Sequence, residues 1–174
     1  MKKLIIIMLL LTACGNAGQY DMPAQNGERV YLGDSITEMC YAYTNGINRA
    51  YPGDTAQDTL YVARQYQYTD EGASYIILVG VNDVLEDMGY SYIYNMERIL
   101  DTLNGHVEII TILPTRYPEI NARIIELNNE LYSLGVPIID RYDEFLDSDG
   151  LLKVEYTTDG VHLTDEGCQL LYAS

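Results

Sequence analysis

The stretch Tyr75-Ile76-Ile77-Leu78-Val79 decides the fold class, because it is apolar at every position. A strand without a polar face is typical of a parallel sheet that helices cover on both sides. Polar residues follow the stretch at once, in Gly80-Val81-Asn82-Asp83. Ligands of such sheets bind at the carboxyl ends of the strands, so we expect the chemistry at this end of the sheet.

Strands and helices alternate on either side of this stretch. Further strands are predicted at 30–32, 47–51, 107–113 and 136–139, and helices at 55–68, 90–103, 120–134 and 164–172. The apolar residues of these helices recur every three or four positions, as they do on one buried helix face. The alternation predicts an α/β protein built as a three-layer α/β/α sandwich.

Length and charge narrow the class of protein further. A chain of 174 residues fits about one domain. Lys and Arg number 10 against 26 Asp and Glu, so the formal net charge is −16. Such a surface repels a nucleic-acid backbone and an anionic lipid surface, which argues against nucleic acid as a partner and against electrostatic adsorption to membranes.

The first residues have the pattern of an export signal. Lys2 and Lys3 precede an apolar run over 4–11, which is much shorter than the ~20 residues that span a bilayer. The following Leu11-Thr12-Ala13-Cys14 resembles the bacterial lipoprotein box, and this resemblance implies cleavage before Cys14 and lipidation of that cysteine. The alternative is an ordinary secretory signal that happens to be followed by a cysteine.

These observations divide the chain into three parts. Residues 1–13 are predicted to be a lipoprotein signal peptide, 14–27 a lipidated cysteine with a flexible polar tether, and 28–174 the folded domain. The protein is then expected in the bacterial cell envelope, exported and held to a membrane by lipid on Cys14. Nothing in the sequence indicates an oligomeric state, or which membrane and which face carry the lipid.

Four short motifs supply the chemistry. Gly33-Asp34-Ser35 follows the first predicted strand, and a serine at a strand-to-helix turn is well presented as a nucleophile. Gly53 follows the second strand and offers a backbone N–H, while Asn82 follows the third and offers a neutral amide donor. In Asp159-Gly160-Val161-His162, the carboxylate can hold one imidazole nitrogen while the other nitrogen faces the serine.

Together and in this order, the motifs resemble those of the GDSL family of serine hydrolases, also called SGNH hydrolases. The resemblance covers residues 28 to about 172, with Ile36 where the family has leucine. It implies a flavodoxin-like sheet of about five parallel strands. It also implies Ser35 as nucleophile, His162 as general base and then acid, and Asp159 as the residue that orients His162.

The resemblance further implies an oxyanion hole made by the N–H groups of Ser35 and Gly53 and by the side chain of Asn82. It requires no metal and no organic cofactor. Each residue also has a structural alternative: Ser35 as a helix N-cap, Asp159 and Gly53 as turn residues, Asn82 as a cap of the next helix, and His162 as a surface histidine.

The substrate expected from this resemblance is an O-acyl ester of a carbohydrate or lipid, cleaved through an acyl-serine intermediate. The short chain leaves little sequence for a lid, which favours short acyl groups, acetyl included. The alternatives are a lysophospholipase or thioesterase for longer acyl chains, an acyltransferase, and a non-catalytic glycan-binding envelope lipoprotein. Tyr90 is a candidate to stack on substrate or to pack on the sheet, and Arg116 to receive an acidic group or to form a salt bridge.

Cys40 and Cys168 are either small buried side chains or a disulfide. Cys40 lies five residues after Ser35, and Cys168 lies six residues after His162. If Ser35 and His162 meet, the helices that follow them start close together, on one face of a flavodoxin-like sheet. We therefore hypothesise a disulfide between the two cysteines.

Overall fold

The computed structural model describes residues 22–173, and the expected signal peptide and Cys14 lie outside this part of the chain. Its sheet is parallel throughout and has the strand order β2-β1-β3-β4-β5. The strands are β1 (Arg29–Gly33), β2 (Ile47–Asn48), β3 (Ser74–Leu78), β4 (His106–Ile110) and β5 (Ile138–Ile139). This confirms the predicted five-stranded, flavodoxin-like α/β fold.

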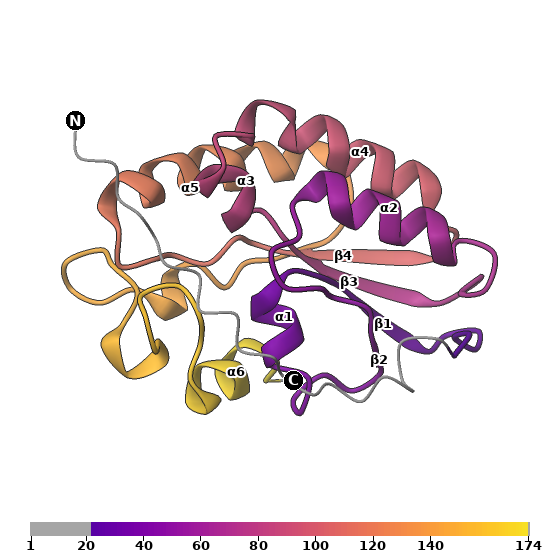
Figure 1. Cartoon of the computed structure of the whole chain (residues 1–174), viewed down its shortest axis with the longest axis horizontal. Coiled ribbons are helices and arrows are strands. Elements are labelled where there is room, and N and C mark those ends of the chain that lie inside the picture. Colours follow the sequence, from indigo (N-terminus) through magenta and orange to yellow (C-terminus); the bar gives the residue numbers. More distant parts are fainter. Residues whose placement is uncertain (1–21, 174) are drawn as a thin grey trace.

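Helices cover both faces of the sheet. They are α1 (Ser35–Met39), α2 (Ala56–Tyr66), α3 (Val81–Leu85), α4 (Tyr92–Thr102), α5 (Pro118–Leu131) and α6 (Asp165–Leu171). In Figure 1, α2, α4 and α5 lie above the sheet, while α1 and α6 lie below it. Within residues 22–173, none of these helices combines the length and the apolar character that a membrane crossing requires.

The core forms on both sides of β3, as its sequence predicts. Tyr75, Ile76, Ile77 and Leu78 are all buried, because one face of the strand packs under each helical layer. The helices turn apolar stripes inward, so that each layer loses its water-facing apolar surface on folding. The buried stripe residues are Leu60 and Ala63 of α2, Met96 and Ile99 of α4, and Ile124, Leu127 and Leu131 of α5.

The strands at or next to the sheet edge are shorter than predicted. Strand β4 ends at Ile110 because the backbone beyond it forms hydrogen bonds with the side chain of Asn128 in α5. The Asn128 side chain accepts a hydrogen bond from the Ile112 N–H and donates one to the Ile112 carbonyl, both at 2.8 Å. At the other edge, Tyr51 still donates to the Gly33 carbonyl, so the pairing next to β1 continues loosely beyond β2.

A buried ion pair holds the amino-terminal segment of the described chain against the domain. Arg49 and Asp70 have fully buried side chains, with 2.6 Å between Arg49 Nε and Asp70 Oδ2. Arg49 also donates to the Met22 carbonyl at 2.5 Å, and the Ala24 N–H donates to Asp70 Oδ1 at 2.9 Å. Residues 22–27 of the expected tether therefore lie on the domain, and 14–21 lie outside the described residues.

Candidate active site

Three side chains from distant parts of the sequence form a hydrogen-bonded chain at the carboxyl end of the sheet. Ser35 Oγ lies 2.9 Å from His162 Nε2, and His162 Nδ1 lies 2.7 Å from Asp159 Oδ2. Ser35 is 7% exposed, whereas about a third of the His162 side chain is open to solvent. The hydroxyl is thus held in one place while water can still reach the imidazole.

The protonation of this chain follows from the state of Asp159. Partial burial by itself raises the pKa of Asp159, but hydrogen bonds from the His162 side chain and from the His162 and Val161 N–H groups outweigh it, and the pKa lies below its ordinary value. An ionised carboxylate can only accept, so Nδ1 carries the imidazole proton. Nε2 is then free to accept the Ser35 hydroxyl proton, as a general base must.

The turn after β1 presents Ser35. Gly33 has no room for a side chain, because a Cβ there would lie 2.1 Å from the Leu78 carbonyl oxygen of β3. Asp34 caps α1 by accepting a hydrogen bond from the Ile36 N–H at 3.0 Å. Ser35 is therefore the first residue of α1, where the backbone N–H groups have no partner inside the helix.

The loop that carries His162 is folded by its own polar groups. Asp159 Oδ1 accepts from the Val161 and His162 N–H groups at 3.0 and 2.8 Å, so one carboxylate fixes both the loop and the imidazole. Thr157 donates its hydroxyl to the His162 carbonyl at 2.8 Å. Gly160 has a φ of +96°, and a Cβ there would lie 3.0 Å from the Arg116 side chain, so glycine is needed at this turn.

The loop after β4 supports the His162 loop from the outside. The Arg116 N–H donates to the Gly160 carbonyl at 2.8 Å, and the Tyr117 hydroxyl donates to the Asp159 carbonyl at 3.2 Å. The Arg116 guanidinium donates to Asp147 Oδ2 at 2.6 Å and to the Leu152 carbonyl at 2.8 Å. Arg116 is thus engaged within the domain, and the salt-bridge alternative describes it better than the substrate contact.

We expect Arg116→Met to lower kcat several-fold and to destabilise the protein by about 1–3 kcal/mol. The variant keeps the aliphatic stem but leaves the Leu152 carbonyl without its donor, which accounts for most of that range, because an ion pair that is 30% and 25% exposed adds less. Thermal unfolding and steady-state kinetics measure both effects, with Arg116→Lys as the control that keeps the charge. A KM that rises only for anionic esters would contradict this assignment and restore the substrate contact.

The predicted oxyanion donors lie at the same end of the sheet. Asn82, in the first turn of α3, donates one amide N–H to the Asp54 carbonyl at 2.9 Å. The amide has a second N–H, so this bond orients the side chain and leaves a donor for a substrate oxygen. Gly53 has a φ of +86°, and none of the described residues accepts a hydrogen bond from its N–H. The Gly53 N–H and one Asn82 amide N–H thus have no acceptor among the described residues, and their oxyanion role stays a prediction.

Each predicted oxyanion donor has an aspartate next to it in the sequence. Burial raises the pKa of Asp34 to about 7, and the nearby charge of Asp83 raises it further. Burial also raises the pKa of Asp54 to about 7, with a further contribution from the charge of Asp58. Burial also raises the pKa of Asp83 to about 6, against the hydrogen bond that its Oδ2 accepts from the Ala56 N–H at 2.9 Å. Oδ1 of Asp83 is buried without a partner among the described residues. The sequence gives no sign of this effect, because it depends on burial.

These raised pKa values predict that the protein loses stability as the pH rises. Between about pH 4 and pH 7 the folded state binds more protons than the unfolded chain, so the free energy of unfolding falls with increasing pH over this window. Asp83→Asn keeps an acceptor for Ala56 but cannot ionise. We expect its melting temperature to fall less between about pH 5 and pH 8 than that of the wild type, by a few degrees.

The matched control is Asp101→Asn, because Asp101 is exposed on α4. This variant should follow the wild-type pH dependence. An Asp83→Asn variant whose melting temperature falls as steeply as that of the wild type would show that Asp83 does not carry the effect.

The two helices that follow Ser35 and His162 are linked below the sheet. A disulfide joins Cys40, at the end of α1, to Cys168 of α6, with a Cα–Cα distance of 5.2 Å. The Tyr172 hydroxyl adds a hydrogen bond to Thr37 Oγ1 at 3.1 Å. Thr37 and Cys40 lie two and five residues after Ser35, and their partners lie ten and six residues after His162, so both links help to hold the two segments together.

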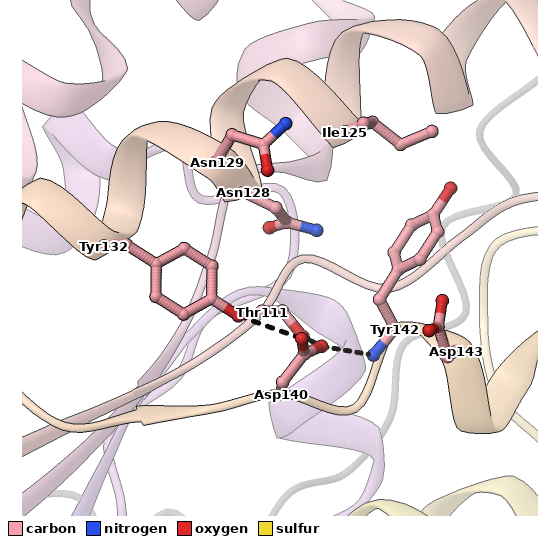
Figure 2. A pocket seen from close by; sticks show the side chains of 8 residues that line it. All are labelled: Thr111, Ile125, Asn128, Asn129, Tyr132, Asp140, Tyr142 and Asp143. Atoms are coloured by element: carbon pink, nitrogen blue, oxygen red, sulfur yellow. Dashed lines mark hydrogen bonds between the residues drawn. The ribbon is translucent and has the colours of Figure 1, made fainter.

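A surface pocket lies apart from this site. Figure 2 shows it between α5 and the segments that follow β4 and β5, with the Asp140 carboxylate accepting hydrogen bonds from Tyr132 and Tyr142. It contains none of the triad or oxyanion residues; its lining consists of Thr111, Ile125, Asn128, Asn129, Tyr132, Asp140, Tyr142 and Asp143.

Tyr90 does not line this pocket. It is 83% exposed in the turn Gly89–Ser91, and its contact with substrate stays a prediction.

Solved structures share this fold. A Streptococcus pneumonia structure that carries the name of platelet activating factor has 25% identity and a TM-score of 0.74, over 84% of this chain and 81% of that chain. A GDSL-like lipase from Bacteroides thetaiotaomicron VPI-5482 has 23% identity and a TM-score of 0.70, over 83% of each chain. A member of the lipolytic protein G-D-S-L family from Veillonella parvula DSM 2008 has 20% identity and a TM-score of 0.71, over 83% of this chain and 93% of that chain.

No curated protein matches the sequence. The model of the GDSL-like lipase/acylhydrolase family, in contrast, matches residues 17–170, which include Ser35, Gly53, Asn82, Asp159 and His162. The chain therefore belongs to the GDSL-like lipase/acylhydrolase family, whose members are hydrolases that act on esters.

Proposed function

We propose that this protein is a serine esterase that removes short acyl groups, acetyl included, from a carbohydrate or lipid through an acyl-Ser35 intermediate. The observation that carries the proposal is the chain of hydrogen bonds from Ser35 Oγ through His162 to Asp159, at 2.9 and 2.7 Å. A glycan-binding protein has no need of a serine aligned with a base, so the alignment argues against the non-catalytic alternative.

In the proposed reaction, His162 Nε2 takes the hydroxyl proton as Ser35 Oγ attacks the ester carbonyl. The same proton then passes to the leaving alkoxide, and the acyl group stays on Ser35. A water molecule then attacks the acyl-Ser35 carbonyl while His162 takes its proton, and His162 returns this proton to Ser35 Oγ as the acid leaves. Asp159 remains ionised throughout and stabilises the imidazolium that forms twice in each cycle.

The negative charge that develops on the carbonyl oxygen needs donors that are already oriented. The Ser35 and Gly53 N–H groups and the Asn82 amide are proposed for this role. Asn82 is held by the Asp54 carbonyl at 2.9 Å, so it loses little freedom when the oxyanion forms. One such donor is worth roughly 3–4 kcal/mol of the barrier.

The preference for short acyl groups is supported by the loops. The longest connection between described helices and strands, 140–164, joins β5 to α6 and is packed down rather than free. Phe145 and Leu152 within it are fully buried, and Arg116 bonds to Asp147 and Leu152. A packed connection of this kind is not available as a lid over a long acyl chain.

A series of p-nitrophenyl esters tests the proposal. We expect kcat/KM to be highest for acetate or butyrate and to fall about 10-fold or more for decanoate, since the packed connection 140–164 is not free to fold over a long chain. Asn82→Ala should lower kcat by about 100-fold with little change in KM. A kcat/KM that rises with chain length would favour the lysophospholipase or thioesterase alternative, and folded protein that cleaves no ester in the series would contradict the proposal.

The proposal includes an envelope location, with lipid on Cys14. Its support is the sequence from Lys2 to Cys14, and the Cys40–Cys168 disulfide, because disulfides persist in oxidising compartments. Labelling of growing cells with an alkyne fatty acid, followed by intact-mass analysis, should find the lipid on the wild type. Cys14→Ala should lose the label, and a label that survives this change would place the lipid elsewhere.

A further inference from the structure

The amino-terminal segment joins the domain at the end of the sheet that is opposite to Ser35. The Gly27 N–H donates to the Gly72 carbonyl at 2.8 Å, just before β3 begins, and Ala24 bonds to Asp70 in the same turn. Arg29, Ser74 and His106 are paired across the amino ends of their strands, whereas Ser35 follows the carboxyl end of β1. The chain therefore reaches the domain at one end of the sheet and carries its reacting groups at the other.

The part of the expected tether that precedes the described residues, 14–21, is too short to go around the domain. Residues 14–21 span at most about 29 Å when fully extended. A domain of this size has a radius of gyration of about 15 Å, so it measures about 38 Å from side to side. A tether that starts at the amino end of the sheet therefore cannot bring the carboxyl end to face the membrane.

The docked segment is not free to lengthen the tether. Releasing it would expose the Arg49–Asp70 pair, whose side chains are fully buried, and would break their contacts with Met22 and Ala24. Hydrogen bonds to charged groups are stronger than those between neutral groups, so this release is unfavourable. The ring of Tyr66 lies 3.7 Å from the Arg49 guanidinium and further holds this arrangement in place.

We propose that the lipidated protein holds its active site away from its own membrane, so that its substrate is an O-acyl carbohydrate in the aqueous phase and not a lipid of that bilayer. The inference rests on the proposed esterase function and on the lipid at Cys14. The charge of the protein agrees with it: without Lys2 and Lys3 the net charge is −18, so anionic headgroups repel the domain.

The orientation can be measured without any activity. Tyr68 follows α2 at the amino end of the sheet, and Tyr90 precedes α4 at the carboxyl end; they are 85% and 83% exposed. Tyr68→Cys and Tyr90→Cys in the lipidated chain each accept one maleimide fluorophore, because the other cysteines are bonded or acylated. With an energy acceptor on the headgroups of phosphatidylcholine vesicles, we expect clearly stronger transfer from position 68. Equal transfer, no transfer from either, or stronger transfer from position 90 overturns the proposal.

The consequence for substrate is tested with one acetate ester in two settings. A chromogenic acetate is supplied free in solution or fixed to the lipid headgroups of the vesicles that carry the enzyme. We expect the fixed ester to be cleaved at least about 10-fold more slowly, and a flexible insert of about 20 residues after Gly18 to remove most of this difference. Equal rates on both esters without the insert overturn the proposal. Failure on the free ester overturns the esterase function instead, and the energy-transfer result still stands.

Discussion

Replacing Ser35 with alanine is expected to lower kcat on a short p-nitrophenyl ester by about 10⁴-fold or more, with KM and melting temperature close to wild type. The reason is that the acyl group is transferred to Ser35 Oγ, which is the atom that lies 2.9 Å from the base, His162 Nε2. Alanine removes one small polar atom from a residue that is 7% exposed, and His162 keeps its bond to Asp159. The residual rate reports the oxyanion donors and substrate binding alone.

His162→Ala gives an internal check on this prediction. Residues that act as one unit have non-additive effects, so the double variant should be little worse than either single variant. Ser133→Ala is the matched control, because it removes an exposed hydroxyl, just after α5, that donates to the Glu130 carbonyl at the end of that helix. A Ser35→Ala enzyme that keeps a rate within about 100-fold of the wild type would remove Ser35 from the mechanism.

The fold could be predicted from the sequence because its main signals are local. The apolar run at Tyr75–Val79 indicates a covered parallel strand without knowledge of its neighbours, and the polar motifs come directly after strands. Once the strands are parallel, their carboxyl ends meet, and Ser35, Gly53 and Asn82 must share one edge. The meeting of Ser35 with His162, 127 residues apart, is different, because no spacing rule predicts it.

Contacts between side chains and backbone groups that are distant in the sequence could not be predicted from it. The Arg116 side chain could bind a substrate or an acid, and only the fold brings Asp147 and the Leu152 carbonyl to it. The Arg49–Asp70 pair likewise joins the residue after β2 to the turn before β3, and only the fold brings these two segments together. The prediction of strand length fails for a similar reason. Ile112 has strand-like neighbours, but its backbone N–H and carbonyl form hydrogen bonds with the Asn128 side chain of α5.

Loss of the Cys40–Cys168 disulfide is expected to destabilise the protein by about 5 kcal/mol, or about 10–20 °C in melting temperature. The bond joins residues 128 apart, so it restrains most of the unfolded chain, and the loop-entropy gain grows with loop length. Cys40→Ala with Cys168→Ala removes both sulfurs and avoids a lone thiol. Thermal unfolding of this variant and of the wild type, with and without reductant, measures the effect.

Catalysis should survive this loss far better than stability does. The His162 loop is also held by Asp159, by Thr157 and by the Arg116–Gly160 backbone bond, none of which involves sulfur. We therefore expect kcat of the double variant to stay within about 10-fold of the wild type at temperatures well below its melting point, where it remains folded. Reductant should lower the melting temperature of the wild type and leave that of the variant unchanged. Two free thiols in denatured, unreduced Cys14→Ser protein would show instead that Cys40 and Cys168 are separate, and the stabilisation would then have to come from packing alone.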